Sequence, residues 1–199
     1  MSDFIVAESP GTAPFGLLML HGTGGDEHDL ADLGHAIAPD AAQLRPRGKV
    51  LEGSANRYFR RIREGVFDPV DFRFRSEELA EFVATRTERP WFAIGFSNGA
   101  SISIGLLTSP NRPIQGAILL RGQFIVEAPE GVRLDGVPVL LLSGEFDPIV
   151  PLAEATKLVD HLRSLGAEVE HRVLSTGHNL VREDVTAAQE WLARKVLKS

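Results

Sequence analysis

The residue of this chain whose setting most clearly allows chemistry is Ser97, the centre of a Gly-Phe-Ser-Asn-Gly pentapeptide at residues 95–99. A short apolar run, Trp-Phe-Ala-Ile, precedes the pentapeptide, and a stretch of small and apolar residues at 100–107 indicates a buried helix after it. A strand, a sharp turn and a helix would hold the serine at the apex of a strained turn, with its hydroxyl exposed. Because a serine hydroxyl is a weak nucleophile at neutral pH, the rest of the chain must supply a base.

An acid and a base follow later apolar segments in the order that such a serine needs. Asp147 comes after the apolar run 137–143, and His178 comes after the alternating segment 168–173. The order Ser, Asp, His is that of the α/β-hydrolase fold, and sites of open α/β sheets lie beyond the carboxyl ends of strands. We therefore predict that Ser97 is the nucleophile, His178 the general base and Asp147 the carboxylate that orients the imidazole. Glu145 is a competitor for the acid, and Asp147 is favoured because it lies farther into the loop.

The tetrahedral oxyanion formed by attack on a carbonyl needs two backbone donors. We expect one to be the Asn98 N–H, at the start of the helix after the turn, where the helix dipole also helps. The second should come from the glycine-rich loop 21–25, and the Thr23 N–H is the favoured group. His21 is expected to support this loop rather than to act as a base. One oxyanion donor is typically worth roughly 10²–10³ in rate.

The elements that would position these residues alternate between strand and helix. Strands are expected at 17–20, 42–45, 91–94, 114–120, 137–143 and 168–173, and helices at 29–38, 72–87, 100–107, 152–165 and 181–197. Ser76 is a candidate cap for the second helix. Alternation of this kind predicts a mostly parallel, doubly wound α/β sheet flanked by helices, in one domain over residues 1–199. The stretch 48–75 breaks the alternation and is long enough to be a lid or a binding loop.

Composition agrees with an ordinary globular protein and excludes several other classes. Hydrophobic residues make up 43% of the 199, and the formal net charge of −6 argues against nucleic acid as a partner. The chain has no cysteine, which excludes disulfides and a cysteine nucleophile. No cluster of metal ligands is evident, so no metal site is expected. The first residues carry no signal-peptide pattern and the apolar runs are too short for a membrane span, so we expect a cytoplasmic protein.

Taken together, four segments resemble the phospholipase/carboxylesterase family of small α/β-hydrolases, over nearly the whole chain. They are residues 20–27, 95–99, 144–150 and 177–178. Residues 57–68 and the Leu-Leu-Arg-Gly segment at 119–122 are similar to a bacterial branch of predicted esterases, the hydroquinone-associated hydrolase group. The acyl-protein thioesterases are more distant members. They usually have Gln where this chain has Asn98, and they differ in the segment 48–75, so their lipidated-protein substrates are not carried over.

The resemblance implies a Ser97–Asp147–His178 triad, an oxyanion hole at Thr23 and Asn98, and esterase activity on small carboxylic esters. It also implies that no cofactor is needed and that the protein is often a homodimer. Within the matching segments, Arg121 and Ile149 are expected to contact substrate. The partner is then a small-molecule ester, with no nucleic acid and no membrane.

The stretch 45–75 is basic, with eight arginines, one lysine and four acids. One interpretation is that it borders the site and favours substrates that carry a carboxylate or another anion. The somewhat favoured alternative is a solvated loop whose arginines pair with surface acids. Tyr58 and Phe59 are expected to line an acyl or aromatic pocket, with core packing as the equally weighted alternative.

The leading interpretation is thus a cofactor-free serine carboxylesterase. A thioesterase is the second enzymatic interpretation, since an acyl-transfer site accepts thioesters as well. A non-catalytic binding protein on a hydrolase fold is a third, because fold and motif do not guarantee turnover.

Overall fold

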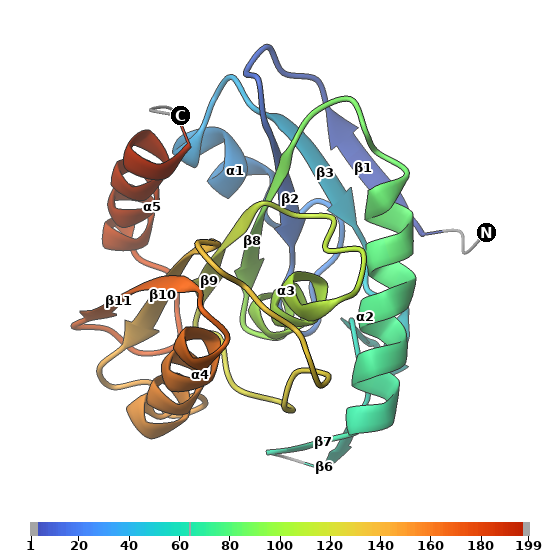
Figure 1. The fold of residues 1–199 in the computed structure, drawn as a ribbon, viewed down its shortest axis with the longest axis vertical. Coiled ribbons are helices and arrows are strands. Elements are labelled where there is room, and N and C mark those ends of the chain that lie inside the picture. Colours follow the sequence, from blue (N-terminus) through green and yellow to red (C-terminus); the bar gives the residue numbers. More distant parts are fainter. Residues whose placement is uncertain (1–3, 64, 197–199) are drawn as a thin grey trace.

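A seven-stranded sheet forms the centre of the computed structural model, which describes residues 4–63 and 65–196 (Figure 1). The strand order is β1-β3-β2-β8-β9-β10-β11; β1 is antiparallel to β3 and every other neighbouring pair is parallel. The strands are β1 (Val6–Ser9), β2 (Gly16–Leu20), β3 (Ala42–Pro46), β8 (Trp91–Phe96), β9 (Gly116–Leu120), β10 (Pro138–Gly144) and β11 (Glu168–Leu174). The expected mostly parallel α/β sheet is confirmed, and β1 is an edge strand that the sequence patterns did not predict.

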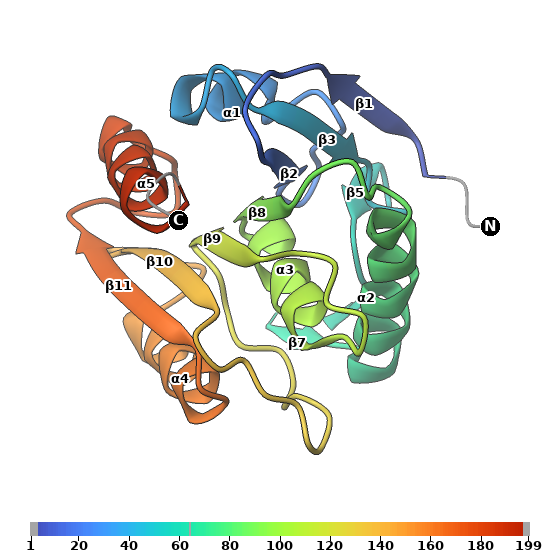
Figure 2. The ribbon, with the colours of Figure 1, turned by 45° about the horizontal axis from the view of Figure 1, so that its top comes forward.

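Within residues 4–63 and 65–196, five helices cover the two faces of the sheet. They are α1 (Ala31–Ile37), α2 (Pro69–Ala84), α3 (Asn98–Thr108), α4 (Leu152–Ser164) and α5 (Arg182–Lys195). Figure 2 shows α1 and α5 on one face and α2, α3 and α4 on the other. Each face has its own apolar core; Trp191 of α5 belongs to one and Leu106 of α3 to the other. Both side chains are fully buried. No helix in the described part of the chain is long and apolar enough to cross a membrane.

The start of α2 differs from the expectation. The helix begins at Pro69, and the Asp68 carboxylate caps it by accepting hydrogen bonds from the N–H groups of Val70 and Asp71. Ser76 is therefore not a cap: it lies inside the helix, where its hydroxyl donates to the Phe72 carbonyl oxygen. Aspartate followed by proline at the first helical position is a strong start signal that outweighs Ser76. At the other end of the chain, the last residue of the helix predicted at 181–197 lies outside the described residues.

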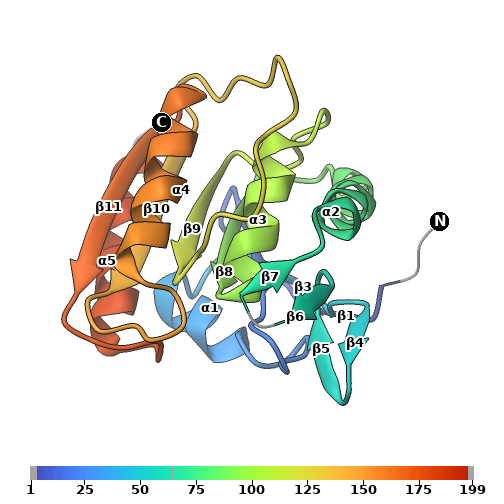
Figure 3. The same cartoon turned by 90° about the horizontal axis from the view of Figure 1, so that it is seen from below.

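The segment that breaks the alternation folds into two small hairpins rather than an irregular loop. Strands β4 (Val50–Glu52) and β5 (Ala55–Arg57) form the first, and β6 (Arg61–Arg63) and β7 (Val66–Phe67) form the second. Glu52 pairs with Ala55, so only two residues make the first turn, and Gly53 there has φ +63°. Figure 3 shows both hairpins together at one end of the molecule.

The order of the strands creates a crevice between β2 and β8. The chain leaves β2 toward β3 on one side, whereas it leaves β8 toward β9 on the other. At such a reversal the two loops diverge beyond the carboxyl ends of their strands, and this is where open α/β sheets bind ligands. Thr23 follows β2 and Ser97 follows β8, so these residues flank the crevice.

Candidate active site

The turn that carries Ser97 is strained, and two glycines allow it. Ser97 has φ +52° and ψ −109°, a backbone conformation that residues other than glycine rarely adopt. A Cβ on Gly95 would lie 2.3 Å from the Gly99 carbonyl oxygen, and a Cβ on Gly99 would lie 1.9 Å from the carbonyl oxygen of Leu20. Only glycine allows β2, β8 and α3 to approach this closely. The result is that Ser97, which is half-buried, lies at the tip of β8 and lines a pocket there.

His178 and Asp147 lie in a hydrogen-bonded line with Ser97. The His178 Nε2 atom is 3.0 Å from the Ser97 Oγ atom, and His178 Nδ1 is 2.8 Å from Asp147 Oδ2. The other carboxylate oxygen accepts hydrogen bonds from the N–H groups of Ile149 and Val150, at 2.8 and 2.9 Å. A carboxylate only accepts, so the proton lies on Nδ1 and leaves Nε2 able to accept the serine proton.

The competing carboxylate, Glu145, does not take part in this line. Its side chain is exposed and its N–H donates to the Leu174 carbonyl oxygen. The Asp147 side chain is only 1% exposed. Of the two acids in this loop, Asp147 is therefore the one in contact with His178.

A buried arginine fixes the loop on both sides of His178. The Arg121 guanidinium donates to the carbonyl oxygens of Gly177 and Asn179, at 3.2 and 3.0 Å. It also makes two parallel bonds to the Asp184 carboxylate, at 2.7 and 2.8 Å. Both side chains of this ion pair are fully buried.

This arrangement corrects the expectation that Arg121 binds substrate. Arg121 lines the pocket beside Ser97, but its guanidinium is fully buried and its charge is paired with Asp184. Its contacts instead hold the carbonyl groups of the residues before and after His178, Gly177 and Asn179. The sequence held no signal for the pairing, because Asp184 is 63 residues away.

The loop proposed to supply an oxyanion donor is anchored by His21. The His21 Nε2 atom accepts a hydrogen bond from the Gly48 N–H at 2.9 Å, so the proton lies on Nδ1, which donates to the Gly22 carbonyl oxygen at 2.7 Å. Burial lowers the pKa of His21, which favours the same neutral form. Arg57 donates to the Thr23 hydroxyl at 2.8 Å and so ties the loop to β5. The Asn98 N–H belongs to the first turn of α3, where N–H groups have no acceptor within the helix.

Tyr58 is buried and is not among the described residues that line the pocket beside Ser97. This corrects the expectation that Tyr58 lines an acyl or aromatic pocket. The residue is 2% exposed, and its hydroxyl donates to the Pro46 carbonyl oxygen at 2.7 Å. Its N–H donates to the Asn98 side-chain oxygen at 2.7 Å. Tyr58 therefore connects the hairpin segment to Asn98, the residue after Ser97, and core packing is the correct alternative for its ring.

A pocket of about 80 Å³ opens beside Ser97. Ser97, Thr23 and Asn98 all line it, so the expected nucleophile and the two residues expected to supply oxyanion donors border one space. Phe59 and Ile149 also line it; Phe59 is fully buried in the core, whereas Ile149 is 62% exposed. That they contact substrate stays a prediction. The remaining lining residues are Arg57, Arg61, Phe67, Ser101, Arg121, Gln123 and Val150.

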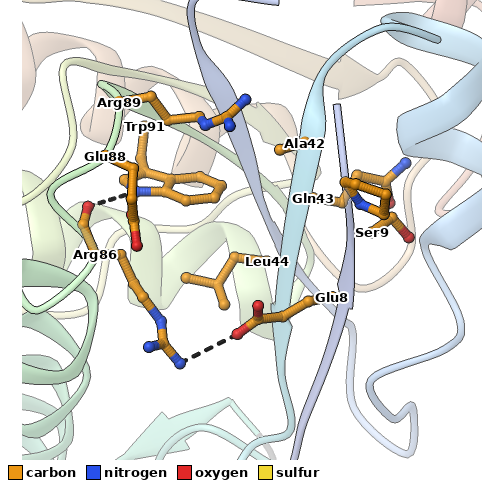
Figure 4. Close-up of a pocket in the computed structure, with 10 residues that line it drawn as sticks. Glu8, Ser9, Ala42, Gln43, Leu44, Arg86, Glu88, Arg89 and Trp91 are labelled. Carbon is orange, nitrogen blue, oxygen red and sulfur yellow. Dashed lines mark hydrogen bonds and ion pairs between the residues drawn. The ribbon is translucent and has the colours of Figure 1, made fainter. Parts of the chain in front are cut away.

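Another cavity, of about 370 Å³, lies at the opposite end of β8 (Figure 4). Trp91, the first residue of that strand, lines it, and Arg86 pairs there with Glu8 at 3.1 Å. The Trp91 indole N–H donates to the Arg86 carbonyl oxygen. This cavity is separated from Ser97 by the length of β8 and is not part of the candidate site.

Most arginines of the stretch 45–75 pair with acids, as the alternative interpretation expected. Arg47 pairs with Glu27 and Arg75 with Glu78. Arg60 contacts Asp68 in the same way. Arg57 and Arg61 differ because they line the pocket beside Ser97.

The chain is similar to known proteins over nearly its whole length. Residues 78–196 match the model of the phospholipase/carboxylesterase family. The chain is 38% identical over 193 residues to the Bacillus subtilis (strain 168) protein named "Putative hydrolase MhqD", and the match covers 94% of this chain and 96% of that protein. The structure is similar to that of a Bacillus cereus carboxylesterase, with a TM-score of 0.91 and 34% identity over 96% of this chain and 94% of the other. It is also similar to YahD, solved with malic acid, with a TM-score of 0.88 and 29% identity over 97% of this chain and all of the other.

Proposed function

Because the chain belongs to the phospholipase/carboxylesterase family and is a serine hydrolase, we propose that it cleaves small carboxylic esters through an acyl-enzyme on Ser97. The observation that carries the proposal is the line of hydrogen bonds from Ser97 through His178 to Asp147. This is the arrangement that converts a serine hydroxyl into a nucleophile without a cofactor.

In the first half of the reaction, His178 Nε2 takes the proton of Ser97 as Oγ attacks the ester carbonyl. Asp147 holds the proton on Nδ1 and stabilises the imidazolium cation. The carbonyl oxygen, now negative, is stabilised by the N–H groups of Thr23 and Asn98. The imidazolium then gives its proton to the departing alkoxide, and the acyl group remains on Ser97.

In the second half, water attacks the acyl-enzyme. His178 takes the proton of the water, and collapse of the tetrahedral intermediate returns that proton to Ser97. The carboxylic acid leaves and the resting state is restored. The contacts of Arg121 with the carbonyl groups beside His178 support this mechanism, since the imidazole must keep one orientation through both halves.

Rapid mixing with 4-nitrophenyl acetate tests the acyl-enzyme. The wild type should release a burst of 4-nitrophenol of at most one equivalent, followed by steady turnover, wherever deacylation is slower than acylation. Ser97→Ala and His178→Ala should lose nearly all turnover while their circular dichroism spectra stay unchanged. Ser109→Ala, at the end of α3, is the matched control and should behave as the wild type. A Ser97→Ala variant with near-wild-type turnover would refute the role of this serine.

The acyl and alcohol groups belong to the same proposal. The Bacillus cereus relative is described as a carboxylesterase and YahD was solved with malic acid, which support small and polar substrates. A thioesterase uses the same attack on a carbonyl, so a comparison of phenyl acetate with S-phenyl thioacetate separates the two activities. The ester should have the higher kcat/KM; a strong preference for the thioester would favour the alternative.

We also propose that residues 1–199 act as one domain, in the cytoplasm and as a homodimer. The unbroken sheet from β1 to β11 supports one folding unit, and the family resemblance supports the dimer. A single cooperative unfolding transition, cell fractionation and light scattering after size exclusion test the three statements.

A further inference from the structure

Two arginines from the hairpins reach the pocket beside Ser97. Arg57 ends β5 and Arg61 begins β6, and both line the pocket together with the nucleophile. None of the described residues that line it is Asp or Glu. The third arginine of the lining, Arg121, is neutralised by Asp184. The positive charge of the pocket therefore comes from Arg57 and Arg61.

These two guanidinium groups share one carboxylate. Glu52 contacts Arg61 at 2.6 Å, but its distance to Arg57 is 3.5 Å. Two cations and one anion leave a local charge of about +1. The Glu52 side chain is 40% exposed, so solvent weakens its hold on both arginines.

Arg57 is the less compensated of the two cations. Its side chain is 4% exposed, and the groups that accept its hydrogen bonds are neutral: the Thr23 hydroxyl at 2.8 Å and the Phe59 carbonyl oxygen at 3.2 Å. Burial lowers the pKa of Arg57, which expresses the cost of keeping this charge away from water. A second anion in the pocket would offset that cost.

The apolar surroundings would strengthen such an interaction. The Arg57 guanidinium carbon is 5.9 and 5.7 Å from the ring centres of Phe59 and Phe67. Electrostatic attraction is larger where rings replace water. A guanidinium has five N–H donors in a planar fork that matches a carboxylate.

From these contacts we infer that the pocket selects esters that carry a carboxylate, which Arg61 and Arg57 bind while Ser97 attacks the ester carbonyl. This inference rests on the proposed esterase function and names its substrate class. Because Arg57 also bonds to Thr23, the same side chain links the anion site to the oxyanion loop.

Two matched pairs of esters test the inference. For a carboxylate on the acyl side, the mono-4-nitrophenyl ester of glutaric acid is compared with 4-nitrophenyl pentanoate. For the alcohol side, 4-acetoxybenzoate is compared with 4-acetoxybenzamide. After subtraction of the enzyme-free rate, kcat/KM of the anionic ester should exceed that of its neutral match in at least one pair. The preference should fall as NaCl rises, because salt screens the attraction.

Three variants assign the preference to these residues. Arg61→Gln should lower the anionic-to-neutral ratio of kcat/KM about tenfold, the loss of one charge-assisted contact at a partly exposed site. Glu52→Gln should raise the ratio, because it frees both guanidinium groups. Arg63→Gln is the matched control: Arg63 is an exposed arginine on the same strand as Arg61, outside the described lining, and its loss should leave the ratio unchanged.

The inference is overturned if the wild type hydrolyses both members of each pair equally and without salt dependence. It is also overturned if Arg61→Gln and Arg63→Gln give the same ratio. In both cases the neutral esters are still cleaved, so the proposed esterase function stands. Failure to cleave any ester, together with an unlabelled Ser97, would remove the proposed function and this inference with it.

Discussion

Removal of the Arg121 guanidinium should cost both stability and turnover. In Arg121→Met the Asp184 carboxylate, with a fully buried side chain, keeps among the described residues only its bond from the Val181 N–H at 2.8 Å. Breaking a buried ion pair in this way costs about 3–5 kcal/mol, because one charge is left uncompensated. The free energy of unfolding of a small domain is only about 5–15 kcal/mol, so a loss of this size is readily measured by urea denaturation.

A second substitution separates the charge from the packing. Asp184→Asn removes the uncompensated charge but keeps an oxygen for the Val181 N–H. The double variant Arg121→Met/Asp184→Asn should therefore be more stable than Arg121→Met alone. A double-mutant cycle should give a coupling of at least about 1 kcal/mol between the two residues.

Turnover should fall for a geometric reason. Without Arg121, the Gly177 and Asn179 carbonyl groups lose donors on both sides of His178. A displacement of about 1 Å at a catalytic group can cost roughly 10²-fold in rate. We expect kcat to fall by about this factor and KM to change little, since the guanidinium does not face the substrate. Arg121→Lys, which keeps the charge but loses the planar fork, should be more stable than Arg121→Met and still impaired in kcat.

Two results would refute this reasoning. One is an Arg121→Met protein within about 1 kcal/mol of the wild type in its free energy of unfolding. The other is a loss seen only in KM, which would indicate that Arg121 acts on the substrate after all.

Three further predictions concern Asp147, the turn that carries Ser97 and the glycine-rich loop 21–25. Asp147→Asn should lower kcat by about 10⁴-fold, because the amide donates to Nδ1 and leaves the His178 Nε2 atom protonated toward the serine. Gly99→Ala should lower both Tm and activity, since its Cβ would lie 1.9 Å from the Leu20 carbonyl oxygen. Burial lowers the pKa of His21, so the stability that its neutral form contributes is complete above about pH 6.5 and is lost as pH falls below that value; His21→Gln should lose less unfolding free energy than the wild type between pH 7.5 and 5.5.

Each of these has its own check. For Asp147→Asn, an unchanged kcat would show that the carboxylate does not set the tautomer. For Gly99→Ala, a wild-type Tm would show that the strand, turn and helix can separate without cost. For His21, the matched control is His35→Gln, an exposed histidine of α1, which should keep the pH dependence of the wild type. The unfolding free energy is measured by urea titration at pH 7.5 and at pH 5.5. An equal loss between these two pH values in the wild type and in His21→Gln would contradict the assignment.

The parts of the site that follow strands could be predicted from the sequence. Apolar runs of strand length are recognised directly, and residues after parallel strands meet at one edge of the sheet. This is why Ser97, Asp147 and His178, far apart in the chain, could be grouped from their positions in the sequence alone. Their catalytic roles remain a proposal.

The structure of the segment 48–75 is harder to predict from the sequence, although the segment contains local patterns of a turn and of a helix start. The two-residue turn after Glu52, with Gly53 at positive φ, is a hairpin pattern, and Asp68 before Pro69 is a helix start. No local sequence pattern predicts which charged side chains pair with one another. The pairing of Glu52 with Arg61 and that of Arg121 with Asp184 depend on distances that only the three-dimensional fold determines. For the same reason, burial of the Tyr58 ring could not be told from exposure in a pocket.

Labelling with a fluorophosphonate probe, followed by mass spectrometry, tests the central claim most directly. The probe reacts with a serine only where a base activates it. The wild type should carry one adduct, on Ser97, which is absent in Ser97→Ala and forms far more slowly in His178→Ala. A folded wild type that remains unlabelled, or a Ser97→Ala variant that is labelled as fast as the wild type, would contradict the proposed role of Ser97 and favour a binding protein on a hydrolase fold.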